Sequence, residues 1–175
     1  MNKNFEEKKF DIPKLKGISE KTMEEHLKLY AAYVKNVNEL MQSEASEYNR
    51  RLNFEFGGMR NHEIYFSHFE NGPKPFDNAG PVKTIDIEAF KSMALTRGVG
   101  WAMIGYDNKS ERFIQYWVDE QHLGHLTGVS PILALDMWEH SYVADYQPSG
   151  KKQYVEDFFE NLNWKSVEEN LKAAE

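Results

Sequence analysis

The residues best suited to chemistry lie in one short stretch, residues 136–142. Asp136 and His140 stand four positions apart, with a tryptophan and a second carboxylate between them. The apolar run 131–135 is typical of a buried strand, so the carboxylate stands where a strand leaves the core. Burying an unpaired carboxylate costs several kcal/mol, so Asp136 needs a strong partner. Asp and His together suit a first-row metal ion, although an Asp that caps a helix beside a packed His is the ordinary alternative on spacing alone.

Composition limits the possible ligands and partners. The chain has 175 residues, 41% of them hydrophobic, which is enough for one or two small domains that share a core. It has no cysteine, so only His, Asp and Glu remain as metal ligands. Its net charge is −7 without a block of Lys or Arg, so we expect no nucleic acid and no membrane partner. The charged N-terminus and the lack of a long apolar run predict a cytoplasmic protein.

Two long helices are expected to precede this stretch. Residues 1–17 are predicted to form an extended arm, followed by a helix from near Ser19 with a capping box at Thr22–Glu25. Its apolar face would hold Met23, Leu27, Tyr30, Val34, Val37 and Met41. A second helix over 47–69 would pair with it as an antiparallel hairpin. Gly57 and Gly58 interrupt that helix at a cost of roughly 1 kcal/mol each, which indicates the close approach of another element or a site.

The second half of the chain predicts a small α/β unit. Residues 71–84 carry three Pro and two Gly and are predicted to be a linker. The elements expected after it are a short helix over 86–97, strands over 100–106 and 112–118 joined by a hairpin turn, a third strand over 131–136, and helices near 151–160 and 164–173. These boundaries give an arm and α-hairpin domain (1–74), a linker (75–85) and a C-terminal α/β domain (86–175).

Residues 136–142, D-M-W-E-H-S-Y, closely resemble the D-V-W-E-H-A-Y signature of the iron/manganese superoxide dismutases. Further stretches resemble that family in the same order: T-M-E-E-H at 22–26, G-G-M-R-N-H at 57–62, R-G-V-G-W-A at 97–102 and N-L-N-W at 161–164. The resemblance implies an α+β fold, in which an N-terminal antiparallel α-hairpin precedes a domain with a three-stranded antiparallel sheet. The metal would lie between the two domains.

The resemblance implies that His26, His62, Asp136 and His140 hold one manganese or iron ion per chain. Three neutral imidazoles and one carboxylate contribute a single negative charge and leave room for a water or hydroxide, so the set suits two oxidation states. The implied activity is the dismutation of superoxide to oxygen and hydrogen peroxide. His68 has no counterpart in the family and is interpreted as structural or as a surface residue.

Gln121 is the candidate for hydrogen bonding to the metal-bound solvent, as in one branch of the family. In another branch a glutamine four residues before the histidine of the second helix takes this role, and here that position is Gly58. This pattern favours manganese, although either metal is possible. His122 or His125 could take the role instead, because the local match is loose.

Aromatic residues of the family's site also have matches here. Tyr33 resembles the gateway tyrosine, with Tyr30 as the competing choice. Trp101, Trp138 and Phe66 would form the apolar wall, where Phe66 replaces a tryptophan common in the family.

Glu139 resembles the glutamate that reaches a metal-ligating histidine of the other subunit, which implies a homodimer. A His–Tyr pair that usually bridges that interface is absent, because Leu29 or Tyr30 and Val143 stand at its positions. Two alternatives remain: a non-catalytic metal-binding or structural member of the same fold, and a metal-dependent hydrolase. For the hydrolase, Glu139 would be the only evident general base.

Overall fold

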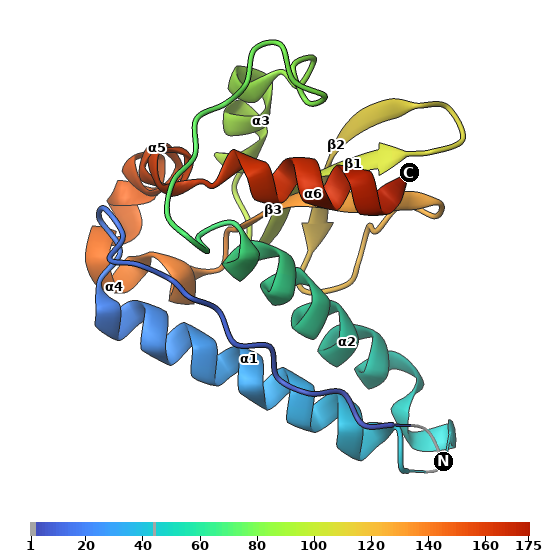
Figure 1. The fold of residues 1–175 in the computed structure, drawn as a ribbon. Helices are drawn as coiled ribbons and strands as arrows, with labels where there is room; N and C mark the ends of the chain where they lie inside the picture. The colour runs from blue at the N-terminus through green and yellow to red at the C-terminus, as the bar shows by residue number, and fades with distance from the viewer. Residues whose placement is uncertain (1–2, 44) are drawn as a thin grey trace.

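The computed structural model describes residues 3–43 and 45–175, and it confirms the α+β fold (Figure 1). Two long antiparallel helices form a hairpin, and an extended N-terminal arm runs along it. A three-stranded sheet with shorter helices around it follows. The elements are α1 (Glu20–Leu40), α2 (Ala45–Ser67), α3 (Ile87–Ala94), β1 (Gly100–Asp107), β2 (Arg112–Asp119), β3 (Val129–Asp136), η1 (Glu139–Ser141), α4 (Val143–Tyr146), η2 (Pro148–Gly150), α5 (Lys151–Asn161) and α6 (Trp164–Ala174).

The sheet has the order β2-β1-β3, and both pairings are antiparallel, as predicted. The central strand β1 pairs Trp101 with Val118 on one side and with Asp136 on the other. Asp136 is therefore the last residue of an edge strand, at the end of the sheet where β1 begins. This placement confirms the prediction that the carboxylate stands where a strand leaves the core.

The start of α1 differs from the predicted capping box. Ser19 is the N-cap, and its hydroxyl accepts a hydrogen bond from the backbone N–H of Thr22 at 3.1 Å. Thr22 lies inside the helix, so the box at Thr22–Glu25 is wrong. At the other end the helix stops at Leu40, which is buried, while Met41 is 46% exposed. Met41 was wrongly assigned to the apolar face because the helical spacing ends one residue earlier.

The predicted linker is irregular but tightly held. The backbone N–H of Lys74 donates to Leu162 O at 3.2 Å, and the ring of Phe76 lies 4.6 Å from that of Trp164. Val82 is fully buried. The hairpin, this segment and the sheet therefore contribute to one hydrophobic cluster.

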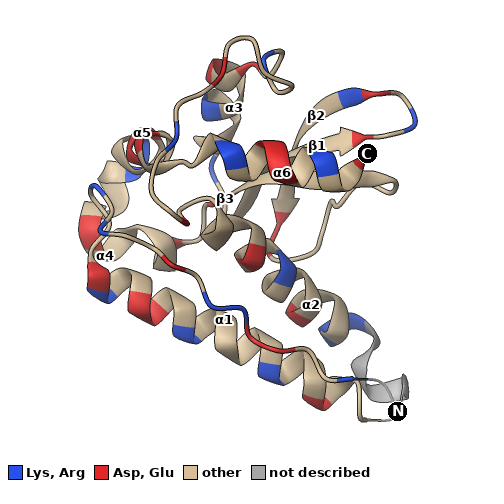
Figure 2. Cartoon of the chain, viewed as in Figure 1, with Lys and Arg blue, Asp and Glu red and all other residues tan. Residues whose placement is uncertain are grey.

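The surface carries both charges in a mixed pattern. Figure 2 shows Lys and Arg interspersed with Asp and Glu along the outer helices. Within the described residues, no helix has both the length and the apolar character needed to cross a membrane.

Candidate metal centre

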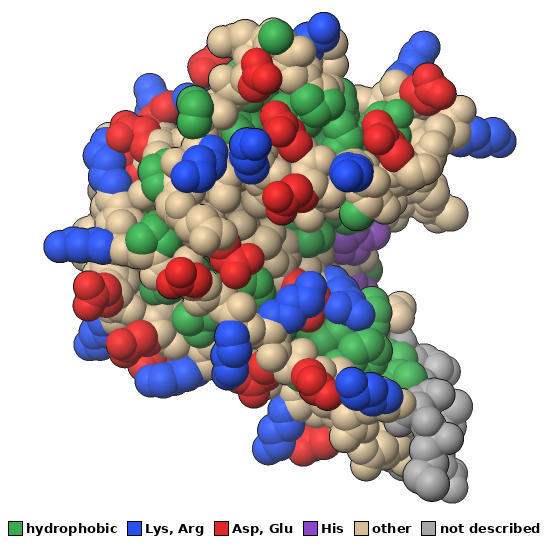
Figure 3. Space-filling model, viewed as in Figure 1, with side chains coloured by type: hydrophobic (Ala, Val, Ile, Leu, Met, Phe, Trp, Pro, Cys, Tyr) green, Lys and Arg blue, Asp and Glu red, His purple; other side chains and the backbone are tan. Residues whose placement is uncertain are grey.

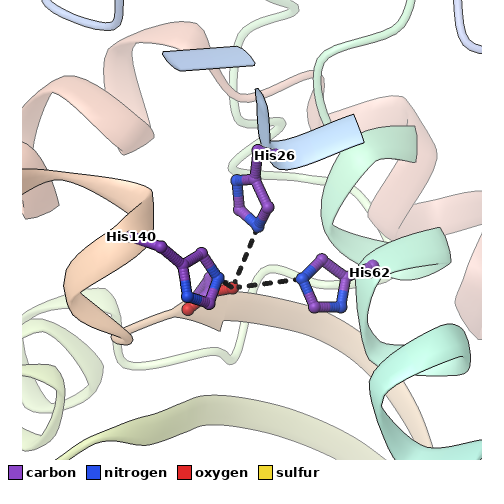
Figure 4. A group of neighbouring side chains, drawn as sticks. His26, His62 and His140 are labelled. Atoms are coloured by element: carbon purple, nitrogen blue, oxygen red, sulfur yellow. Dashed lines mark hydrogen bonds and ion pairs between the residues drawn. The ribbon is translucent and has the colours of Figure 1, made fainter. Parts of the chain in front are cut away.

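Four polar side chains meet where the hairpin faces the end of β3. His26 comes from α1, His62 from α2, Asp136 from the end of β3 and His140 from η1. One ligand atom from each lies within 4.8 Å of all the others. Figure 4 shows the three imidazoles approaching the carboxylate from different sides. The resemblance gave these four residues, and the fold brings all four together.

The distances in this cluster suit a single ion. Oδ2 of Asp136 lies 3.2 Å from His26 Nε2, 3.2 Å from His140 Nε2 and 3.7 Å from His62 Nε2. Atoms bound to one ion at about 2.1 Å lie roughly 3 to 4 Å apart, so the set fits around a first-row metal. The Nε2 atoms of His26 and His62 are buried and have no hydrogen-bond partner among the described residues. An ion held between these two nitrogens and the carboxylate would satisfy both of them.

Hydrogen bonds behind the cluster orient the ligands. His62 Nδ1–H donates to the backbone carbonyl of Gly58 at 2.6 Å, which places the lone pair of Nε2 toward the carboxylate. The backbone N–H of Trp138 donates to Asp136 Oδ1 at 2.7 Å, and this leaves Oδ2 to face the imidazoles. The Tyr154 hydroxyl donates to the backbone carbonyl of Asp136 at 2.8 Å. The Ser141 hydroxyl lies 3.1 Å from the same oxygen and makes its shorter bond, at 2.6 Å, to the carbonyl of Trp138. Sequence reasoning missed both, because neither spacing nor residue type indicates these contacts.

The electrostatics of the cluster favour a cation. Burial lowers the pKa of His26 and lowers that of His62 to about 3, so both rings are neutral. Burial opposes the charge of Asp136, but His140 and then His26 outweigh it and hold the pKa of this carboxyl below its usual range. Burial also opposes protonation of His140, and Asp136 outweighs it and raises the pKa of that ring. Two neutral imidazoles beside an ionised carboxylate suit a cation, and a bound ion would take the place of the proton that Asp136 favours on His140.

Comparisons with known proteins agree with this arrangement. Residues 80–170 match the family model described as iron/manganese superoxide dismutases, C-terminal domain. The chain is 31% identical to a protein of Mycobacterium avium named as a manganese superoxide dismutase, over 85% of this chain and 82% of that protein. The chain belongs to the iron/manganese superoxide dismutase family. It is also 28% identical to a protein of Aquifex aeolicus named as an iron superoxide dismutase, over 91% of this chain and 87% of that one.

Aromatic rings enclose the cluster in this member of the family. The ring centroid of Trp101 lies 5.0 Å from that of His62, and the ring centroid of Phe66 lies 5.0 Å from that of His26. The rings of Trp138 and His140 are stacked, with their centroids 6.0 Å apart. Trp101 and Phe66 are completely buried, so they shield the cluster from water.

The two candidate gateway tyrosines have different surroundings. The hydroxyl of Tyr30 donates to Glu63 at 3.2 Å and accepts from the backbone N–H of Lys8 at 2.9 Å, so it is engaged away from the cluster. The ring of Tyr33 lies 5.1 Å from that of His62. A Cβ on Gly58 would stand 2.6 Å from the Tyr33 ring, so a glycine is needed there. This contact confirms that close approach explains Gly58.

Gln121 is completely buried beside Trp101. Trp101 Nε1–H donates to its Oε1 at 2.9 Å, and Asn61 Nδ2 donates to its backbone carbonyl at 3.0 Å. A Cβ on Gly57 would collide with that same carbonyl, so Gly57 also marks a close approach. The amide Nε2 of Gln121 has no partner among the described residues.

The remaining histidines lie outside the cluster. His122 and His125 line a pocket of about 710 Å³ between α2 and residues 122–131, together with Leu52 and Phe56. Figure 3 shows histidine side chains at the back of a hollow between the hairpin and the sheet. His68 is completely buried, so it is not a surface residue.

Glu139 is exposed, and the adjacent His140 side chain is 30% exposed. His140 is thus the one ligand of the four that reaches the surface of the chain.

Proposed function

We propose that this protein is a superoxide dismutase that uses one manganese or iron ion held by His26, His62, Asp136 and His140. The proposal is carried by two buried imidazole nitrogens, of His26 and His62, that have no hydrogen-bond partner in the described part of the chain. They face an ionised carboxylate beside a third imidazole. When bound, the ion supplies a one-electron cycle that oxidises one superoxide to oxygen and reduces a second, which takes up two protons from the solvent and leaves as hydrogen peroxide.

The residues of the chain set the conditions for that cycle. Three neutral imidazoles and one carboxylate add a single negative charge, which suits both oxidation states and leaves a net positive centre for an anionic substrate. Gln121 is proposed to donate a hydrogen bond from Nε2 to solvent in the site. This buried amide has no hydrogen-bond partner among residues 3–43 and 45–175 as far as their side chains are described, which supports that role. Such hydrogen bonds tune the potential of a metal centre.

Two aromatic residues, Tyr33 and Trp101, are proposed to control access. Tyr33 would stand at the entrance, because its ring lies against His62 while the Tyr30 hydroxyl is engaged elsewhere. Trp101 would exclude water and hold Gln121 through its indole N–H. A dry, shaped wall strengthens the electrostatic interactions inside it.

Glu139 is proposed to bind His140 of a second copy, which would make the protein a homodimer. Their exposure on adjacent positions supports this proposal. We further propose that the chain divides into domains 1–74 and 86–175, joined by 75–85, with the ligands drawn from both.

Gly58 and Gln121 favour manganese in this proposal. Relatives named for manganese and for iron are both similar to the chain. The four ligands are common to manganese and iron sites, so they do not discriminate between the two metals. The hydrogen bonds around the ligands must therefore set the preference.

The test is superoxide dismutation by the same preparation loaded separately with manganese and with iron, with bound metal counted per chain. We expect one ion per chain and activity with manganese, with iron or with both. Asp136→Asn should lose metal and activity together, while Asp107→Asn, the same change at the last residue of β1, should lose neither. One bound ion per chain without activity from either metal would refute the proposed dismutase activity. The protein would then be a metal-binding member of the fold without that activity.

A further inference from the structure

The outer edge of β3 is hydrogen-bonded by side chains instead of by another strand. In the described part of the chain, β3 has a strand neighbour only on the β1 side. Asn170 of α6 donates from Nδ2 to the carbonyl of Ile132 at 3.0 Å. The backbone N–H of Ala134 donates to His68 Nε2 at 3.1 Å. These bonds satisfy main-chain groups that a buried edge would otherwise leave unpaired.

His68 is the link between this edge and the helix that carries His62. It follows α2 directly, and its ring is completely buried. His68 Nδ1 lies 2.8 Å from Ser166 Oγ, which donates to the carbonyl of Asn163 at 2.8 Å. The backbone carbonyl of His68 accepts from the N–H of Asn163 at 2.7 Å. Ring and backbone of this one residue therefore contact both β3 and the start of α6.

The direction of each bond follows from the donors available. The Ala134 N–H can only donate, so Nε2 of His68 must carry a lone pair and the proton must be on Nδ1. Nδ1–H then donates to Ser166, whose own proton goes to Asn163. Burial lowers the pKa of His68 to about 3, which keeps the ring neutral and this arrangement intact at ordinary pH.

We propose that His68 is a positioning residue for the metal centre, which locks the strand that ends in Asp136 against the helix that carries His62. Ala134 lies two residues before Asp136, so its bond to His68 fixes the end of β3. A shift of β3 along α2 would break this bond and change the 3.7 Å separation of His62 Nε2 and Asp136 Oδ2. Metal sites tolerate only small errors in ligand position. The inference rests on the proposed function only in requiring that the cluster binds a metal ion.

The experiment compares three substitutions at position 68 by the rate at which manganese-loaded protein loses its metal to a chelator. In His68→Gln, Oε1 reaches as far as Nε2 and can accept from Ala134. His68→Asn can reach Ser166 but not Ala134, and His68→Leu can make neither bond. We expect His68→Asn and His68→Leu to lose metal about tenfold faster than wild type, and His68→Gln to lose it at close to the wild-type rate. The electron paramagnetic resonance spectrum of the bound manganese should change for Asn and Leu in the same way.

A purely structural role is separated by a matched control. Val167 is buried on α6 beside Ser166 and makes no bond to His68, so Val167→Ala lowers stability without breaking the link. The inference is overturned if His68→Leu loses metal no faster than Val167→Ala. It is also overturned if His68→Gln loses metal as fast as His68→Asn. If His68→Leu does not fold, the comparison of Gln with Asn decides. Wild type that binds manganese but does not dismutate superoxide would overturn the proposed activity alone, whereas wild type without metal would overturn both.

Discussion

A methyl group at position 57 should destabilise the protein although it favours the helix. Replacing a helical glycine by alanine ordinarily adds about 1 kcal/mol of stability. Here the new Cβ of Gly57→Ala would collide with the backbone carbonyl of Gln121. Overpacking of this kind costs about 1 to 3 kcal/mol. The same carbonyl accepts from Asn61 Nδ2, and a buried donor left unpaired costs about 1 to 3 kcal/mol more.

The net expectation for Gly57→Ala is a loss of about 3 kcal/mol, or roughly 6 to 12 °C in Tm for a chain of this size. The assay is urea unfolding of the metal-free protein followed by circular dichroism, with thermal melts beside it. Asn61→Ala is the matched control, because it removes the hydrogen bond without adding a methyl group, and it should cost less. If Gly57→Ala were as stable as wild type or more stable, the close approach of α2 to Gln121 would not constrain this position.

Two further predictions concern stability alone. The pKa of His68 is about 3 in the folded protein and near 6.5 in the unfolded chain, so only the unfolded state binds this proton as the pH falls below 6.5. Between pH 7.5 and 4.5 the free energy of unfolding of metal-free wild type should therefore fall by about 2.5 kcal/mol more than that of His68→Gln, as measured by urea unfolding. A difference between the two proteins that does not vary with pH would contradict a buried neutral ring. Ser19→Ala should cost about 1 kcal/mol, because it removes the N-cap of α1; an unchanged urea midpoint would show that the Ser19 hydroxyl contributes nothing there.

Hydrophobic spacing and turn residues were enough to predict most elements. The three strands were expected within two residues of their observed ends, because their apolar runs are bounded by turn residues. The first helix begins near Ser19 as expected, but its capping box was wrongly assigned to Thr22–Glu25, because both Ser19 and Thr22 are residue types that can serve as an N-cap. Only the side-chain hydrogen bond to Thr22 N distinguishes them.

Short motifs predicted the candidate site residues. They did not predict the side chains that hydrogen-bond to those residues and their neighbours. The choice between Tyr30 and Tyr33 depends on Lys8 and Glu63, which engage the hydroxyl of Tyr30 from distant parts of the chain. The contact of Tyr154 with the carbonyl of Asp136 is equally long-range. Such partners leave no pattern in local sequence, since each is a single side chain brought near by the fold.

The hydrogen bonds along the outer edge of β3 also bear on aggregation. An apolar edge strand with free main-chain groups is a template on which another chain can add a strand. Residues 132–135 would make such a template, but the side chains of His68, directly after α2, and of Asn170 on α6 already occupy groups on that edge. This protection exists only while those helices are docked. A partly unfolded chain in which α6 has detached would expose the strand, so the species most prone to aggregate is one that keeps its sheet and has lost its helical cover.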